Sequence, residues 1–205
     1  YFVRHFWELT STQIGYLNLP YFLSALLALK LAPAVSKRLG KKVGGMTVLG
    51  LSFAFAPLPF ILRLLDLFPE NGTDTLFWTL IVFNTVEVTL IIAASALVSA
   101  MIADVVEDSE IKTGRRSEGI FFAANSFAQK AVNGLGVVVA GQILAIIQFP
   151  TGAKPGEVPS ETVDSLAIYY IPVILVFYVA ALSILSLYRI NREGHEANLQ
   201  QLESR

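Results

Sequence analysis

The chain contains no cysteine and carries little charge for its length. Its 205 residues include 2 His and 15% charged residues, against 54% hydrophobic residues. Without cysteine there is no disulfide framework, thiolate nucleophile or cysteine-based metal site, and the two histidines, His5 and His195, lie at opposite ends. The net charge of −1 gives no sign of a nucleic-acid partner. This composition is unusual for a soluble globule and favours a membrane protein with no resident metal or cofactor.

Long apolar runs dominate the chain. A helix that crosses the hydrocarbon core needs about 20 mainly apolar residues, and five stretches are long enough: 14–35, 43–65, 76–103, 119–149 and 166–188. They lack the apolar/polar alternation of barrel strands, and backbone groups in lipid must be satisfied within a helix or a closed barrel. The sequence therefore predicts an all-α membrane protein with a transmembrane bundle over 1–188. Pro57 and Pro59 are expected to kink or interrupt the second span.

Basic residues gather at one end of the predicted spans. Cytoplasmic loops are enriched in Lys and Arg, and three segments that fall on one side carry Lys37, Arg38, Lys41, Lys42, Lys112, Arg115, Arg116, Arg189 and Arg192. The opposite loops carry one Lys and six acids: Lys154, Asp66, Glu70, Asp74, Glu157, Glu161 and Asp164. The residues 189–205 are therefore predicted to form a cytoplasmic tail. The opening "YFVRHFW" reads as the end of an earlier helix, so we expect a further segment before it.

Polar residues interrupt the fourth span at helical spacing. Ser126 and Lys130 are four residues apart, and so are Asn125, Gln129 and Asn133, which places all five on one helical face. A charge at the bilayer centre costs about 2.5 to 3.5 kcal/mol on insertion scales, so it normally faces protein or a water-filled cavity. Lys130 is therefore expected to point inward. Two roles stay open for it: an interhelical salt bridge, and contact with a solute or coupling ion.

Glu87 is the corresponding anomaly of the third span. It shares a face with Asn84, Ile91, Ser95 and Ser99 through steps of three and four residues. It lies about a dozen residues from the outer end of its span, and Lys130 lies about a dozen from the inner end of its own, so at about 1.5 Å per residue their depths are similar. Glu87 is therefore a candidate partner of Lys130 within the chain and, with Ser95, a candidate contact for a solute or coupling ion.

The segment between the third and fourth spans has an acidic block followed by a basic block. The acids are Asp104, Glu107, Asp108 and Glu110, and the residues that follow are Lys112, Arg115, Arg116 and Glu118. The positive-inside pattern explains the cations but not four acids within seven residues. A charge-paired gate at the cytoplasmic side explains both, because such pairs can close in one conformation and be hydrated in another.

The motif "ADVVEDSEIKTGRRSEGIFF" followed by "SFAQKAVNG" resembles the glycoside-pentoside-hexuronide:cation symporters of the major facilitator superfamily. The resemblance covers essentially the whole chain, and "SKRLGKK" matches a looser feature of the superfamily. It implies the C-terminal six-helix bundle of a twelve-helix transporter, with five complete transmembrane helices here plus the end of a preceding one. Solute and cation are then bound between two bundles whose access alternates across the membrane.

The resemblance also implies roles for individual residues. Lys130 matches a lysine beside the sugar and cation sites, and Ser126 matches a hydroxyl residue one turn earlier. Asp104 and Arg116 match charged positions that pair with the other bundle to close the cytoplasmic side. The acids that bind the coupling cation, Na⁺ or H⁺, are expected in the N-terminal half, so this segment alone is not expected to transport. Ser95 stands where sugar-transporting members have a Trp that packs on the sugar ring.

Several readings therefore stay open. The first is a symporter for a sugar, glycoside or related solute in a bacterial inner membrane. The second is a carrier for a lysolipid or other amphiphile, and the third is a scaffold or sensor that has lost transport. Ser126 and Lys130 are one turn apart, as in Ser–Lys catalysis, but a helix interior has no free backbone N–H groups for an oxyanion hole. An enzyme is the least favoured reading, and no catalytic residue is expected.

Overall fold

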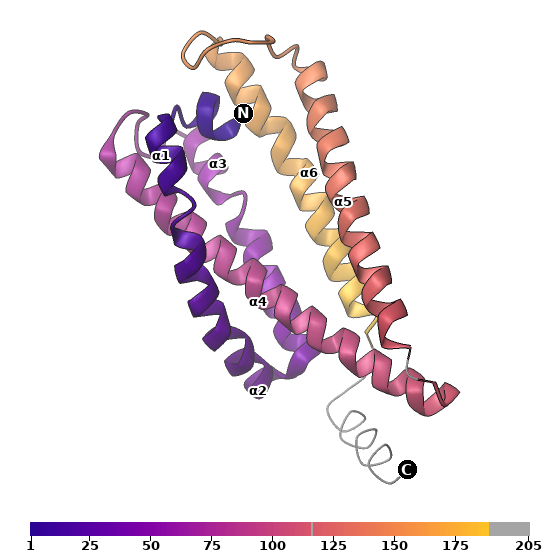
Figure 1. The fold of residues 1–205 in the computed structure, drawn as a ribbon. Coiled ribbons are helices and arrows are strands. Elements are labelled where there is room, and N and C mark those ends of the chain that lie inside the picture. Colours follow the sequence, from indigo (N-terminus) through magenta and orange to yellow (C-terminus); the bar gives the residue numbers. More distant parts are fainter. Residues whose placement is uncertain (116, 189–205) are drawn as a thin grey trace.

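The computed structural model describes residues 1–115 and 117–188, and within them the chain is helical and contains no strand (Figure 1). The predicted tail, 189–205, and Arg116 lie outside the described residues. The elements are a short π-helix and six α-helices: η1 (Phe2–Phe6), α1 (Ser11–Tyr16), α2 (Pro20–Phe55), α3 (Leu58–Leu64), α4 (Asp74–Thr113), α5 (Glu118–Ile146) and α6 (Ser160–Ser186). The predicted all-α membrane class is confirmed.

Helix α2 is two antiparallel arms joined by a tight turn at Gly40. This residue has φ 78° and ψ 167°, a conformation open essentially to glycine alone. Figure 1 shows the chain doubling back at this point, between the predicted spans 14–35 and 43–65. The arms approach closely: a Cβ added to Gly44 would lie 2.7 Å from Val35 Cγ1. Four helical stretches in the described residues are long and apolar enough to cross a membrane, and the first of them, Ser11–Leu64, contains both arms.

Two breaks interrupt the helices at the ends of these arms that lie far from Gly40. The first separates α1 from α2 at residues 17–19, just before Pro20. Proline has no backbone N–H to continue the helical hydrogen-bond pattern. The Leu17 carbonyl accepts a hydrogen bond from Asn84 Nδ2 at 3.0 Å. The second break separates α2 from α3 at Ala56 and Pro57, where prolines predicted an interruption. The first break was not predicted, because the apolar pattern runs through it.

Helix α4 extends well beyond its predicted span. It has 40 residues, so it is about 60 Å long, whereas the hydrocarbon core is about 30 Å thick. The acidic block that the sequence places between two spans is therefore helical. The helix ends at Gly114, which adopts φ 69° as its left-handed cap, and the connection to α5 is only a few residues long.

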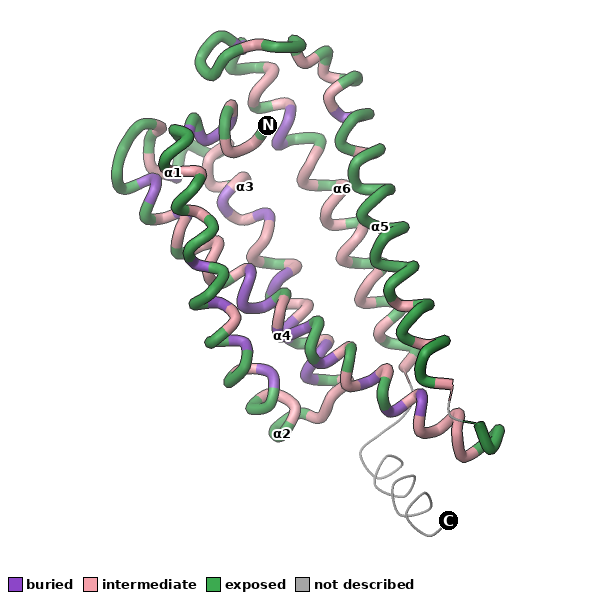
Figure 2. The backbone as a smooth tube through the Cα atoms, viewed as in Figure 1, coloured by how far each residue is buried: buried purple, intermediate pink, exposed green. Residues whose placement is uncertain are grey.

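The packed core lies between α2 and α4. Small residues of the two helices, including Ala28, Ala32, Ala93 and Ala94, are buried together and let the backbones approach closely. A second cluster around Trp7 and Leu76 closes the outer end. By contrast α5 is exposed along most of its length (Figure 2): only 6% of its most apolar window is buried, against 33% for α4. Lipid or other protein must therefore cover α5.

Candidate functional site

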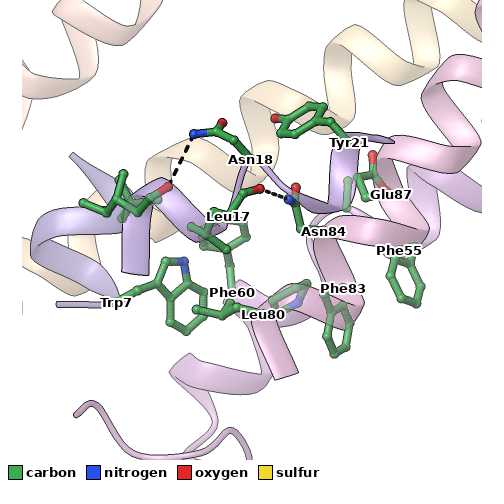
Figure 3. Close-up of a pocket in the computed structure, with 14 residues that line it drawn as sticks. Trp7, Leu17, Asn18, Tyr21, Phe55, Phe60, Leu80, Phe83, Asn84 and Glu87 are labelled. Carbon is green, nitrogen blue, oxygen red and sulfur yellow. Dashed lines mark hydrogen bonds between the residues drawn. The ribbon is translucent and has the colours of Figure 1, made fainter. Parts of the chain in front are cut away.

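A cavity of about 330 Å³ lies where the two helix breaks face α4. Its lining comes from η1, α1, both breaks and α4, and Figure 3 shows the residues around it. The polar members are Asn18, Tyr21, Asn84 and Glu87, and the larger apolar members are aromatic. Irregular backbone at membrane depth occurs where it is buried in protein or lines a cavity. The two breaks line the cavity, and they therefore mark a candidate binding site.

Glu87 sits at the meeting point of three helices. Ser52 Oγ, from α2, and the Tyr178 hydroxyl, from α6, each lie 2.7 Å from Glu87 Oε1 and donate hydrogen bonds to it. Ser52 is completely buried, and its hydroxyl also lies 2.7 Å from that of Tyr178. The second carboxyl oxygen, Oε2, is buried and has no hydrogen-bond partner among the described residues. Sequence spacing could not reveal this cluster, because its members come from three separate helices.

The five polar residues of α5 share a face that the described part of the chain does not cover. Lys130, Ser126, Gln129 and Asn133 are exposed, and Asn125 is partly buried. The less exposed residues Phe121, Asn125 and Ile143 recur along one stripe of the helix. Lys130 is five residues from Asn125, about 140° around the helix axis, so it points away from this stripe. Its ammonium forms no ion pair within residues 1–115 and 117–188.

Glu87 and Lys130 lie at similar depths but do not meet. Glu87 is 13 residues from Asp74 at the outer end of α4, and Lys130 is 16 residues from Ile146 at the outer end of α5. At about 1.5 Å per residue these separations are about 20 and 24 Å. The hydrogen bonds of Glu87 go to hydroxyls, and Lys130 does not line the cavity. Ser95 is also exposed and outside the lining.

A polar cluster ties three elements together at the opposite end of the bundle. Asp104, on α4, is 2% exposed. Lys41 Nζ, from the turn of α2, donates to Asp104 Oδ1, and the Tyr188 hydroxyl, just after α6, donates to Oδ2 at 2.7 Å. Burial, and then the Asp104 carboxylate, raise the pKa of Tyr188, so this hydroxyl stays protonated and keeps donating. Lys42 Nζ donates to the Ser186 carbonyl at 2.7 Å.

The other residues of the predicted gate that the structure describes lie on the last turns of α4 and on the segment that leads into α5. Glu107 and Glu110 are partly buried on the last turns of α4, while Arg115 and Glu118 are exposed. Asp108 pairs with Lys112 one turn later, at 2.7 Å. The sequence analysis did not assign Lys41 or Tyr188 to the gate. The basic turn "SKRLGKK" was the available signal for Lys41, whereas nothing near Tyr188 in the sequence pointed to Asp104.

Comparison with known proteins gives the family. A family model described as "MFS/sugar transport protein" matches residues 1–192. The chain belongs to this family. It is 30% identical to "Uncharacterized symporter sll1374" of Synechocystis sp., over 100% of this chain and 36% of that protein. It is also 30% identical to "Putative glycoside/cation symporter YagG" of Escherichia coli, over 71% of this chain and 26% of that protein.

Membership of this symporter family confirms the resemblance found in the sequence. The MFS/sugar transport match covers the cavity, the polar face of α5 and the cluster around Asp104. The chain spans about a third of the length of the first relative and about a quarter of the second. No solved structure matches the chain significantly. The chain is therefore a multi-pass membrane protein of a transporter family.

Proposed function

We propose that the chain is the C-terminal bundle of a cation-coupled symporter for a sugar, glycoside or related small organic solute. The observation that supports this most directly is the uncovered polar face of α5. It carries a lysine and four hydrogen-bonding side chains within an apolar helix, and the described chain supplies no partner for the lysine. A second bundle, the N-terminal half of the transporter, would cover this face and enclose a watery path between the two.

In this proposal Lys130 links the solute to the coupling cation. The cation, Na⁺ or H⁺, binds mainly to carboxylates of the N-terminal half, close to the Lys130 ammonium. Ser126, Asn125, Gln129 and Asn133 offer hydrogen bonds to the solute, and Glu87 and Ser95 are candidate contacts from α4. Coupling follows if solute and cation both favour the same closed conformation, because each ligand then shifts one shared equilibrium.

The cluster around Asp104 would form the fixed side of a cytoplasmic gate. Lys41 and Tyr188 hold the Asp104 carboxylate in place, so the acidic end of α4 is presented as one rigid surface. Glu107, Glu110 and Glu118, with Arg115 and Arg116, would then pair with the other bundle when the inner side closes. A cytoplasmic C-terminus and a bacterial inner membrane are part of the same proposal.

Uptake by the complete transporter tests the role of Lys130. Lys130→Ala should abolish sodium- or proton-dependent uptake while the protein still reaches the membrane in normal amounts. Lys154→Ala, which removes a lysine from the exposed outer loop, is the matched control and should transport normally. Coupled uptake that survives in Lys130→Ala would contradict the assignment, and a wild-type protein that moves no solute would favour a scaffold or sensor.

One observation favours a second solute class. The aromatic platform expected for sugar is absent at Ser95, whereas the cavity beside Glu87 has one polar and one aromatic region (Figure 3). A carrier for a lysolipid or another amphiphile would use such a lining. A parallel uptake screen of glycosides and lysolipids, with sodium and pH varied, separates the two classes.

A further inference from the structure

The cavity beside Glu87 has the size and position of a small-molecule site. Its volume of about 330 Å³ lies in the usual range for such sites, about 300 to 1,000 Å³. The α1–α2 break, the α2–α3 break and α4 surround it. The polar face of α5, on which the proposed function chiefly depends, contributes nothing to its lining, and Glu87 is the one residue assigned to both the cavity and the proposed function.

The polar atoms that remain available in the cavity are mainly acceptors. Asn84 Nδ2 donates to the Leu17 carbonyl at 3.0 Å, and Asn18 Nδ2 lies 3.5 Å from the Ile14 and Gly15 carbonyls. Each side-chain amide therefore turns its nitrogen toward backbone carbonyls, and its oxygen accepts no side-chain hydrogen bond found among the described residues. A ligand that satisfies this lining must bring hydrogen-bond donors.

Glu87 adds a buried carboxyl oxygen without a partner. Hydrogen bonds from Ser52 and Tyr178 fix Oε1, and the buried Oε2 has no hydrogen-bond partner among the described residues. Glu87 itself lines the cavity. Among residues 1–115 and 117–188, no Lys, Arg or His lines the cavity to neutralise the carboxylate. An unpaired charge in the membrane interior costs free energy. A cationic ligand would pair with the Glu87 carboxylate and remove this cost, whereas a neutral polyol would not.

The remainder of the lining is aromatic and apolar. Figure 3 shows Trp7, Phe60 and Phe83 on the side of the cavity away from Asn18 and Tyr21. Aromatic faces attract cations within about 6 Å of the ring centroid, and they bury apolar groups effectively. A ligand with a cationic head and an apolar body would match both regions of the lining.

We propose that this cavity binds an organic ammonium ion that carries an apolar or aromatic body. The ammonium group donates to the Glu87 carboxylate and to the amide oxygens of Asn84 and Asn18. Its body packs among Trp7, Phe60 and Phe83. Ser52 and Tyr178 position the carboxyl by holding its Oε1 oxygen.

Calorimetric titration of the complete protein in non-ionic detergent tests the proposal. The probes are 2-phenylethylammonium and 2-phenylethanol, which differ chiefly in the charged donor group. The wild-type protein should bind the ammonium at least about 10-fold more tightly, as expected for a hydrogen bond to a charged group. Equal affinity for the two probes, or no saturable binding of the ammonium, would overturn the proposal, and this comparison needs no variant.

Glu87→Gln then locates the site. The variant keeps a side-chain oxygen that accepts from Ser52 and Tyr178 but removes the charge, so the preference for the ammonium should be lost. Glu157→Gln, in the exposed outer loop, is the matched control and should keep it. A folded Glu87→Gln protein that retains the full preference would show that the ammonium binds elsewhere and would overturn the proposal.

The same titration separates this inference from the proposed function. Ammonium binding that persists in Lys130→Ala, while coupled uptake is lost, upholds both. Ammonium binding in a wild-type protein that shows no coupled uptake supports the ammonium site in the cavity and rejects the proposed symporter function. Coupled uptake without ammonium binding upholds the transporter and rejects the cavity ligand.

Discussion

Glu87 and Asp104, two carboxylates of α4, are stabilised in different ways. Asp104 receives a lysine and a tyrosine hydroxyl, so its charge is compensated. Glu87 receives two hydroxyls and no cation. A buried charge is costly unless it is paired. Asp104 therefore has the properties of a structural anchor, and Glu87 has those of a ligand-binding group. Their surroundings therefore predict different responses to substitution.

The ion pair of Asp104 should respond asymmetrically to the loss of each partner. Lys41→Met leaves a carboxylate that is 2% exposed without its cation, and such losses cost about 3 to 5 kcal/mol. Asp104→Asn leaves Lys41, whose side chain is 29% exposed, able to reach water, so its cost should be smaller, about 1 to 2 kcal/mol. Unfolding free energies of the purified protein in denaturing detergent measure both.

The exposed pair of Asp108 and Lys112 provides the control for that experiment. The Lys112 side chain is 70% exposed, so Lys112→Met should change stability by no more than about 0.5 kcal/mol. If Lys41→Met were no more harmful than Lys112→Met, the cluster around Asp104 would not be an anchor.

The hydroxyls around Glu87 should act through the carboxyl. Ser52→Ala and Tyr178→Phe each remove one donor to Oε1, and interhelical hydrogen bonds in membranes are worth about 0.6 kcal/mol on average. The two substitutions should be non-additive, because they share one acceptor and contact each other. In a Glu87→Ala background this coupling should shrink, and a coupling that stays unchanged there would show that the hydroxyls interact without the carboxyl.

At this scale the sequence predicts residues but not their partners. Glu87 and Lys130 were singled out because charge is unusual in apolar runs, and Asp104 because it belongs to an acidic block beside a span. Ser52 and Tyr178 were not, since Ser and Tyr are common in membrane helices and lie 35 and 91 residues from Glu87. Spacing along one helix identifies neighbours on a face, whereas contacts between helices depend on how the helices pack.

At the scale of elements, the turn of α2 depends on one glycine. Gly40→Ala places a Cβ in a conformation that costs about 1 to 3 kcal/mol for other residues. Gly50 is helical and has open space around a Cβ, so Gly50→Ala should be neutral or stabilise by about 0.5 to 1 kcal/mol. Thermal unfolding of the two purified variants checks the contrast. A harmless Gly40→Ala would mean that the arms do not need this turn.

The two faces of α5 should differ in access to water. Asn133 and Leu135 are both exposed in the structure and lie about 200° apart on the helix. Because the chain has 0 Cys, Asn133→Cys and Leu135→Cys each introduce a single thiol into it. In the complete transporter a water-soluble maleimide should label Asn133→Cys at least about 10-fold faster, since only a hydrated thiol ionises readily. Equal rates would contradict a watery path along the polar face.

Helix positions were easier to predict than helix interruptions. A run of about 20 apolar residues suffices for a span, so the apolar stretches were visible in sequence. The break before Pro20 was missed, because it is stabilised by Asn84 from another helix. The helical acidic block of α4 was also missed, since its charges suggested a loop, whereas its residues continue the helix to a glycine cap at Gly114.

At the scale of the whole molecule, burial is uneven. The arms of α2 pack tightly on α4, whereas α5 and α6 each have only 6% of their apolar window buried. The second bundle proposed for this transporter would have to cover the polar part of that surface, because lipid can cover only the apolar part. The second bundle of the proposed function would thus also account for the uneven burial.

The charge asymmetry of the two ends predicts the orientation in the membrane. Figure 1 shows the turn of α2 and the inner end of α4 at one end, and the loop between α5 and α6 at the other. Arg38, Thr113 and Thr151 are exposed positions at these two ends. By the positive-inside rule the first two face the cytoplasm. In intact cells a membrane-impermeant thiol reagent should therefore label Thr151→Cys but not Arg38→Cys or Thr113→Cys.

Permeabilised cells complete the topology experiment, because all three thiols should then react. Protection of Thr151→Cys together with labelling of the other two in intact cells would invert the orientation and move the cluster around Asp104 outside. The proposed gate would then close the outer side. Labelling of Arg38→Cys and Thr113→Cys from opposite sides would show that the turn of α2 and the end of α4 do not lie on one side of the membrane. That result would contradict the bundle on which both proposals rest.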